Sequence, residues 1–328
     1  MRWSISRALA TLALVLAMAL APPGSARSAD WPAKPVRIIV PYAAGGAADT
    51  AGRLYAEALS TAFGKQFIVE NRTGGGGLPA AEAVARAEPD GYTLLVSGIP
   101  ILVLAPAMNK NVGYDPLRDL TQIAYFGGAP SVLVVHPQLG PKSYPEFRAY
   151  ARAAAGGTDY VSAGFGTMGN WIAEYLAAAE KIKLNHVAYK GGAQAMLDLL
   201  AGHVKVAMLT YASVSGHIRA GSLVPLAVTS ADRMTALPEV PTLRELGLGD
   251  FTSLVWFSLS GPARMPMEIV EAINREANKA MQAPHIREQM ARDAIEAKPM
   301  TPAEMTRFTQ DEIDRWGPLI KRIMATKE

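Results

Sequence analysis

The chain has 328 residues, of which 50% are hydrophobic and 19% charged, and it contains no cysteine. This composition is that of an ordinary globular protein, and the lack of cysteine excludes disulfides and thiolate metal sites. The net charge of +3 is matched by three arginines within the first 28 residues, which hold no acid. The rest of the chain is therefore neutral, without a basic excess for binding nucleic acid or a membrane surface.

The first 29 residues are predicted to be a signal peptide. Arg2 and Arg7 precede an apolar run at residues 8–21, which is too short to span a bilayer. Small residues follow, so cleavage is expected between Ala26 and Ala29. We therefore expect export to a bacterial periplasm, with an uncleaved anchor as the alternative.

The elements after residue 30 alternate between strand and helix patterns. A β-branched run at residues 36–40 predicts a buried strand, and a loop with two glycines at residues 42–48 leads to a helix starting near Asp49. Further strands are expected at residues 67–69, 92–97, 122–125, 131–136, 158–163, 186–189, 204–209, 224–229 and 254–259. Further helices are expected at residues 79–87, 143–155, 168–176, 193–201, 268–281, 285–294 and 302–324, with a break at residues 127–130.

A strand–loop–helix unit with glycines in the loop occurs three times, at residues 36–59, 158–176 and 186–201. In α/β folds with parallel sheets, ligands bind at the carboxyl ends of the strands. The free N–H groups and the dipole of a first helical turn favour negative charge at that place. Each unit therefore predicts a corner that can receive an anion.

The length of the mature chain, about 300 residues, exceeds what one core usually serves, so two domains are expected. Residues 129–251 can form a domain inserted into one made of residues 30–128 and 252–328. The chain would then cross between the domains near residues 127–130 and near residues 249–253. Two short crossings form a hinge, and two lobes with glycine loops facing a cleft can close around a ligand.

The sequence holds no set of residues that indicates catalysis. Its five histidines are scattered, and no metal motif, nucleophile elbow or phosphate-binding lysine occurs, so no enzyme, metal or cofactor is expected. Residues 164–169 fit the dinucleotide pattern G-x-G-x-x-G. The acidic residue that would bind the ribose about 20 positions later is replaced by Tyr189 and Lys190, so a nicotinamide-dependent enzyme is a weak alternative.

Three charged residues near the glycine loops have two interpretations each. Asp49 could bind a ligand, or it could stabilise the helix and pair with Arg53, which is the interpretation we favour. Arg72 is expected to form a local salt bridge rather than an anion clamp, and Lys190 is expected to point to solvent.

Two tryptophans could stack on an aromatic ligand. Buried tryptophans usually serve packing, so packing is the expected role of Trp171 and Trp256. Trp171 nevertheless favours an aromatic or long-chain acid as the ligand.

Six ordered motifs resemble one family, the Bug receptors, which are the solute-binding proteins of tripartite tricarboxylate transporters. The motifs are W-P-A-K-P-V-R-I-I-V-P-Y-A-A-G-G-A-A-D, E-N-R-T-G-G-G-G, P-D-G-Y-T-L-L, G-F-G-T-M-G-N, Y-K-G-G and L-P-E-V-P-T-L-R-E-L-G-L. The resemblance runs from Trp31 to the C-terminal helices. It implies an α/β fold of the type II periplasmic-binding-protein kind, with two lobes around a cleft and a two-crossing hinge.

The resemblance also implies a ligand and a mode of binding. In the family, the loop that corresponds to residues 42–49 holds a carboxylate through backbone N–H groups and ordered waters, and the loops at residues 164–167 and 189–192 supply the opposing lobe. The candidate ligand-binding residues are Tyr42, Ala43, Gly45, Gly46, Ala47, Asp49, Ser97, Gly164, Gly166, Thr167, Asn170, Tyr189, Gly191, Gly192 and Thr210.

Four positions depart from the family's usual residues, so the identity of the ligand does not carry over. Ala44 and Ala188 stand where proline is usual, Asn170 stands where histidine is frequent, and Trp171 replaces an aliphatic residue.

The predicted function is a periplasmic receptor, expected to be a monomer, that delivers a small organic carboxylate to membrane permease subunits. Two alternatives are a ligand-presenting partner of a membrane sensor and a receptor for a cationic or neutral solute. Asp49 is the only acidic residue of the loops, which argues against a cation.

Overall fold

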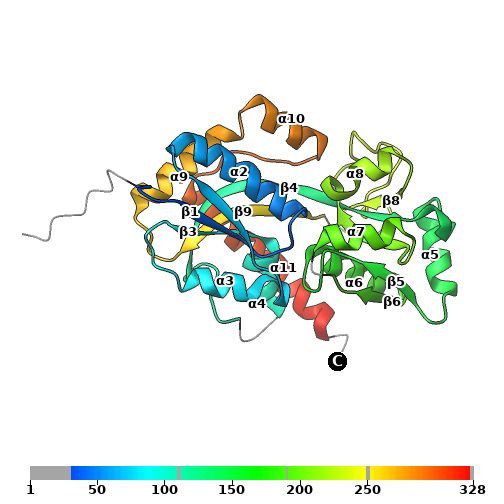
Figure 1. Ribbon diagram of the computed structural model, residues 1–328. Helices are drawn as coiled ribbons and strands as arrows, with labels where there is room; N and C mark the ends of the chain where they lie inside the picture. The colour runs from blue at the N-terminus through cyan, green and yellow to red at the C-terminus, as the bar shows by residue number, and fades with distance from the viewer. Residues whose placement is uncertain (1–30, 109–111, 190, 249–251, 326–328) are drawn as a thin grey trace, which may run out of the picture.

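The computed structural model describes residues 31–108, 112–189, 191–248 and 252–325, and it forms two lobes joined by long strands (Figure 1). The strand order is β2-β1-β3-β9-β4-β7-β5-β6, with β8 also paired to β4. The strands are β1 (Val36–Val40), β2 (Phe67–Asn71), β3 (Thr93–Gly98), β4 (Leu120–Val135), β5 (Thr158–Val161), β6 (Leu184–Val187), β7 (Val206–Thr210), β8 (Val224–Val228) and β9 (Leu254–Pro262).

Helices cover both parts of this strand array. The first lobe carries α2 (Ala47–Phe63), α3 (Leu78–Ala85), the π-helical turn η3 (Pro100–Leu104), α4 (Ala105–Met108), α9 (Met267–Ala280), α10 (Pro284–Arg292) and α11 (Pro302–Ala325). The second carries α5 (Tyr144–Ala153), α6 (Met168–Glu180), α7 (Gly192–Leu200) and α8 (Tyr211–Arg219). Short 3-10 turns lie at Gly75–Gly77 and Pro137–Leu139.

Strand β1 shows why its sequence forms a central strand. Four of its five residues are fully buried, and Arg37 is the exception. Ile38 packs into the cluster beneath α2 and α9, whereas Ile39 packs into the cluster on the opposite face. Successive side chains of a strand point to opposite faces, so this near-continuous apolar run is buried on both sides.

The two sheets are mixed rather than parallel throughout. Strands β1, β2 and β3 pair in parallel, as do β5, β6 and β7. Strand β9 runs antiparallel to both β3 and β4, and β4 runs antiparallel to β7 and β8. The strands that join the lobes are therefore antiparallel to their neighbours, whereas the strands of the repeated strand–loop–helix units are paired in parallel.

The predicted break at residues 127–130 is wrong, because β4 is continuous through it. The pairing of β4 with β9 continues to Pro130, and register shifts accommodate the glycines. Gly127 has φ +97°, and a Cβ there would lie 2.5 Å from Ile295, while Gly128 exchanges backbone hydrogen bonds with Glu296. The glycines thus allow a neighbouring segment to approach the strand closely.

Strand β4 also forms the first connection between the lobes. Its residues up to Pro130 pair with β9, and its residues from Ser131 onward pair with β7 and β8. The second predicted crossing includes residues 249–251, which lie outside the described residues. The predicted signal peptide and residues 109–111 also lie outside them. None of the described helices is long and apolar enough to cross a membrane.

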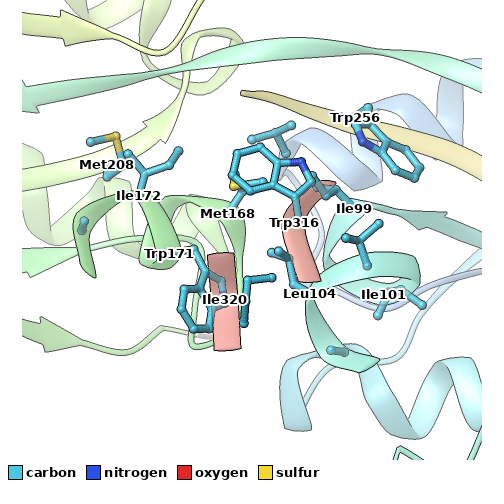
Figure 2. Close-up of a cluster of buried hydrophobic side chains, with 14 of the residues drawn as sticks. Ile99, Ile101, Leu104, Met168, Trp171, Ile172, Met208, Trp256, Trp316 and Ile320 are labelled. Carbon is cyan, nitrogen blue, oxygen red and sulfur yellow. The ribbon is translucent and has the colours of Figure 1, made fainter. Parts of the chain in front are cut away.

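One apolar cluster extends across both lobes. Figure 2 shows Trp171 and Ile172 of α6 near Trp316 and Ile320 of α11. Helix α11 also packs against η3, α4 and β4 of the first lobe. The segment of η3 and α4 was not recognised in the sequence, because its apolar run has neither a two-residue nor a 3.6-residue period.

Candidate functional site

A central cavity lies between the lobes at the place where four helices begin. The helix starts contribute Gly46, Ala47 and Ala48 of α2, Thr167, Met168 and Gly169 of α6, Gly191 and Gly192 of α7, and Thr210 of α8. Strands and loops complete the wall with Tyr42, Ala43, Pro100, Ser131, Ala163, Met208, Leu209, Val255 and Phe257. The cavity offers ≈ 60 Å³ to the centres of water-sized molecules, several times the volume that one buried water needs.

The first turns of these four helices keep free backbone donors. None of the four residues that precede them caps its helix with a side-chain hydrogen bond. In the described part of the chain, no hydrogen bond uses the N–H groups of Ala47, Ala48, Gly169 or Gly192. Because each helix start also carries partial positive charge, the cavity favours an anion.

Two buried hydroxyls add polar groups to the cavity wall. Ser131 is fully buried at the point where β4 enters the second sheet, and its Oγ has no hydrogen-bond partner among the described residues. The hydroxyl of Tyr42 is likewise buried and unpartnered within the described chain, and burial raises the pKa of Tyr42. Buried polar groups normally have partners, so both hydroxyls suit a bound guest.

The described lining of the central cavity contains no charged side chain. Lys190, which could have approached it, lies outside the described residues. An anion bound there would therefore depend on amides and hydroxyls rather than on an arginine or lysine among the described residues.

Asp49 organises the first glycine loop from the third position of α2. Its carboxylate accepts hydrogen bonds from the N–H of Gly45 (2.9 Å), from Nε of Arg53 (2.9 Å) and from Nδ2 of Asn71 (2.8 Å). Burial raises its pKa, but the hydrogen bonds from Arg53, Gly45 and Asn71 outweigh burial, so the net pKa of Asp49 is lowered. The predicted pair with Arg53 is present, and this carboxylate lines none of the cavities described here.

Asn170 does the same for the loop of the second lobe. It holds the third position of α6, and its Oδ1 accepts a hydrogen bond from the N–H of Gly166 at 3.1 Å. Its Nδ2 donates to the hydroxyl of Tyr160 at 2.8 Å. Asp49 and Asn170 therefore fix the two loops by matching contacts, which is consistent with the repeated unit found in the sequence.

Three of the loop glycines donate their backbone N–H groups within the protein. The N–H of Gly45 bonds to Asp49, that of Gly164 bonds to Oγ of Ser162 and that of Gly166 bonds to Asn170. These three glycines shape the loops, and the free donors at Ala47, Ala48 and Gly169 lie two or three residues after Gly45 or Gly166, in the first helical turns.

Two hydroxyls among the candidate ligand-binding residues have hydrogen-bond partners within the protein. The hydroxyl of Thr167 donates to the carbonyl of Gly164 at 2.8 Å, so its proton is already used. Ser97 of β3 is buried, with 2% of its surface exposed, and its hydroxyl forms hydrogen bonds with the hydroxyls of Ser258 and Ser260 on β9. It lines none of the three cavities described here.

The structure gathers most of the predicted residues but divides them among three cavities. The central cavity receives Tyr42, Ala43, Gly46, Ala47, Thr167, Gly191, Gly192 and Thr210. A side cavity receives Gly45 and also touches Ala47 and Thr210. A third cavity beside residues 74–77 receives Gly164 and Tyr189, and the Tyr189 hydroxyl donates to Asp198. Asp49, Ser97, Gly166 and Asn170 line none of the three.

Several cavity residues were missed in the sequence. Ser131 follows the falsely predicted break, and Phe257 lies within a strand whose register cannot be read from one sequence. The two tryptophans have the packing role that was expected, because both are buried in the apolar core. Trp171 donates a hydrogen bond to Sδ of Met108 at 3.0 Å, and Trp256 donates one to Glu312 at 2.9 Å. Neither lines these cavities, so Trp171 provides no argument for an aromatic ligand.

The lobes contact each other at the edge of the central cavity. A Cβ placed on Gly191 would lie 3.1 Å from the Cβ of Ala43, and one on Gly45 would lie 3.7 Å from the Cβ of Ala193.

Away from the cavities, Arg72 forms its predicted local salt bridge with Glu70 at 2.8 Å. In the described residues, no group of three or more metal-ligating side chains occurs.

Comparison with known proteins gives the family. A family model described as "Tripartite tricarboxylate transporter family receptor" matches residues 51–324. Protein BugT of Bordetella pertussis is 32% identical over 324 residues, which cover 98% of this chain and 99% of that protein.

Solved structures agree with this match. The periplasmic binding protein BugD has a TM-score of 0.85 at 28% identity, covering 89% of this chain and 98% of that one. Rpa4515 of R. palustris, solved with adipate, has a TM-score of 0.85 at 30% identity, covering 90% and 98%. MatC of Rhodopseudomonas palustris, solved with bound malate, has a TM-score of 0.84 at 28% identity, covering 88% and 100%.

The two-lobed α/β fold is that of the type II periplasmic binding proteins, and the family and its structural relatives are solute-binding proteins rather than enzymes. The predicted resemblance is therefore confirmed, and this chain belongs to the tripartite tricarboxylate transporter receptor family, which includes the Bug proteins.

Proposed function

We propose that this receptor captures a small organic carboxylate in the central cavity and delivers it, in the periplasm, to permease subunits of a tripartite tricarboxylate transporter. The carboxylate oxygens would accept hydrogen bonds from the free amides of Ala47, Ala48, Gly169 and Gly192. The observation that carries the proposal is that four uncapped helix starts converge on a cavity whose described lining has no charged side chain.

The helix starts account for the preference for an anion. Each one stabilises a negative charge by roughly 0.3–1 kcal/mol when exposed and by up to about 2 kcal/mol when partly buried. Four together contribute on the order of 1–8 kcal/mol, from which the cost of removing the carboxylate from water is subtracted. This preference would separate an acid from its uncharged amide of the same shape.

Two relatives support the ligand class. Rpa4515 was solved with adipate and MatC with malate, and both ligands are carboxylates. The unpartnered hydroxyls of Tyr42 and Ser131 provide further contacts for a ligand in this chain.

Closure of the lobes would complete the site. We assign residues 30–128 and 252–328 to one domain and residues 129–251 to the other, with β4 as one of the two connections. Contacts such as that between Gly191 and Ala43 would enclose the ligand, and opening at the permease would release it. The predicted signal peptide, cleaved between Ala26 and Ala29, would direct the chain to the periplasm.

A thermal-shift screen with pairs of acids and their amides tests the binding mode. A ligand at about 100 times its Kd stabilises the folded state by about 2.7 kcal/mol, so a bound acid should raise the Tm by several degrees. The matched amide, butyramide against butyrate for example, should leave the Tm unchanged. Equal shifts for acid and amide, or no shift from a broad set of mono- and dicarboxylates, would refute capture of carboxylates.

Delivery to a permease is tested in cells. Uptake of the labelled acid should be lost when the receptor gene is deleted and restored by the wild-type gene. If uptake persists while a transcriptional response to the acid is lost, the receptor serves a membrane sensor instead.

A further inference from the structure

We propose that the ligand is a monocarboxylate with an apolar body of several carbons, whose acid group occupies the central cavity and whose body extends into the side cavity. This assignment rests on the proposed function and narrows it from carboxylates in general to one class. It separates this chain from relatives that hold dicarboxylates of similar length.

The side cavity adjoins the central one. The two share Ala47, Thr210, Val255 and Phe257 in their walls. The side cavity offers ≈ 200 Å³ to the centres of water-sized molecules, against ≈ 60 Å³ in the central cavity. A ligand whose acid group lies at the helix starts therefore has more space for its body in the side cavity than in the central cavity.

The wall of the side cavity is mostly apolar. Tyr55 and Phe126 stack with ring centroids 3.7 Å apart and an interplanar angle of 8°, and both are almost fully buried. Leu54, Met290 and Ile295 extend this surface. Burying a hydrocarbon chain here is favourable in proportion to the apolar area removed from water.

The polar groups of this wall do not suit a second carboxylate. No lysine, arginine or histidine of the described chain lines the cavity. Asp293 does line it, in the part that the central cavity does not share, and none of the ion pairs within the described residues involves Asp293. Its carboxylate accepts a hydrogen bond from Nε2 of Gln289 at 2.6 Å.

The remaining polar groups are uncharged. They belong to Thr50, Thr210, Ser213, Gln289 and Tyr55, and the Tyr55 hydroxyl has no hydrogen-bond partner among the described residues. The distal end of the ligand can therefore carry a neutral polar group, whereas a second carboxylate would meet an acid that forms no ion pair within the described residues and receives the hydrogen bond of Gln289, which itself accepts one from Arg292.

Calorimetric titration of butyrate, hexanoate and adipate tests the assignment. Each methylene buried should tighten binding by about fourfold, so hexanoate should bind about 15-fold tighter than butyrate. Adipate has the same number of carbons as hexanoate, and it should bind at least about tenfold weaker because its second carboxylate approaches Asp293. Equal affinity for butyrate and hexanoate, or tighter binding of adipate than of hexanoate, would overturn the proposal.

Two variants locate the effect in the side cavity. Asp293→Asn should strengthen adipate binding at least about fivefold and leave hexanoate unchanged, whereas Asp311→Asn, an exposed change on α11 that removes the same charge, should alter neither. Ala51→Leu fills the side cavity and should reduce hexanoate to the affinity of butyrate while butyrate is unaffected. The Tm of each ligand-free variant reports whether it is folded.

The outcomes separate this inference from the proposed function. If dicarboxylates and short acids bind but chain length has no effect, the carboxylate receptor stands and the apolar body is refuted. If Asp293→Asn and Asp311→Asn change adipate binding equally, the carboxylate of Asp293 does not face the ligand and the proposal fails. If none of the acids binds, the receptor function fails and this assignment fails with it.

Discussion

Replacing Ala47 by proline would remove one backbone donor from the central cavity and leave the helix intact. Ala47 is the first residue of α2, where proline is well tolerated because the N–H makes no bond within the helix. The preceding residue, Gly46, already has the extended conformation that precedes proline, with φ −86° and ψ 171°. The variant should therefore fold, with a ligand-free Tm within about 2 °C of the wild type.

The effect on binding should be large by comparison. A hydrogen bond to a charged group contributes about 1.5–3 kcal/mol, which corresponds to a loss of about 10- to 150-fold in affinity. Because the first helical turn acts on the acid group, butyrate and hexanoate should lose the same factor.

Calorimetric titration measures this change, and Met267→Pro is the matched control. Met267 is the first residue of α9, it is exposed and it lines none of the three cavities described above. The control should bind acids like the wild type. If Ala47→Pro melts normally and binds acids with unchanged affinity, the start of α2 does not hold the carboxylate.

Three further variants probe the loops and the packing around the cavity. Asp49→Asn should cost about 1–3 kcal/mol of stability at neutral pH, because the pKa of Asp49 is lowered in the fold. That stability is present above the ordinary value of 3.8 and is lost as the pH falls further, so melting curves of the variant should depend less on pH below 3.8; a large loss of affinity with an unchanged Tm would contradict this structural role. Gly169→Ala would place a Cβ 2.3 Å from a backbone oxygen of β7, so its Tm should fall by several degrees, and an unchanged Tm would contradict the close packing of α6 on β7. Gly191→Val should weaken acid binding about tenfold by crowding Ala43 of the other lobe, whereas Gly216→Ala, which meets open space, should not; equal affinities would show that this contact does not enclose the ligand.

The alternating elements could be predicted because their local signals agree with the fold. The strand at residues 36–40 has the bounds of β1, and the last three helices were placed within two residues at each end. The joining strands were harder, because Gly127, Gly128 and Pro130 indicate a break in any single sequence. Their pairing with β9 and the approach of Glu296 keep the strand continuous, and both are contacts between distant segments.

The proposed donors overlap in part with the residues expected from the sequence, because Ala47 and Gly192 were among those residues, whereas Ala48 and Gly169 were not. The sequence shows where glycine loops meet helix starts, and the central cavity lies at those places. It does not show that Asp49 and Asn170 would use the N–H groups of Gly45 and Gly166, because such contacts depend on the shape of each loop. Ser131 and Phe257 were missed because their place in the cavity depends on the register of β4 and β9.

The apolar cluster of Figure 2 has a consequence for how this receptor could be divided or recombined. Each lobe has a buried apolar cluster of its own, but Trp316 and Ile320 of α11 share a third cluster with Trp171 and Ile172 of α6. Calorimetry should accordingly record a single cooperative melting peak for the whole chain. A chimera that exchanges the second lobe with that of a relative would have to carry a compatible α11 with it.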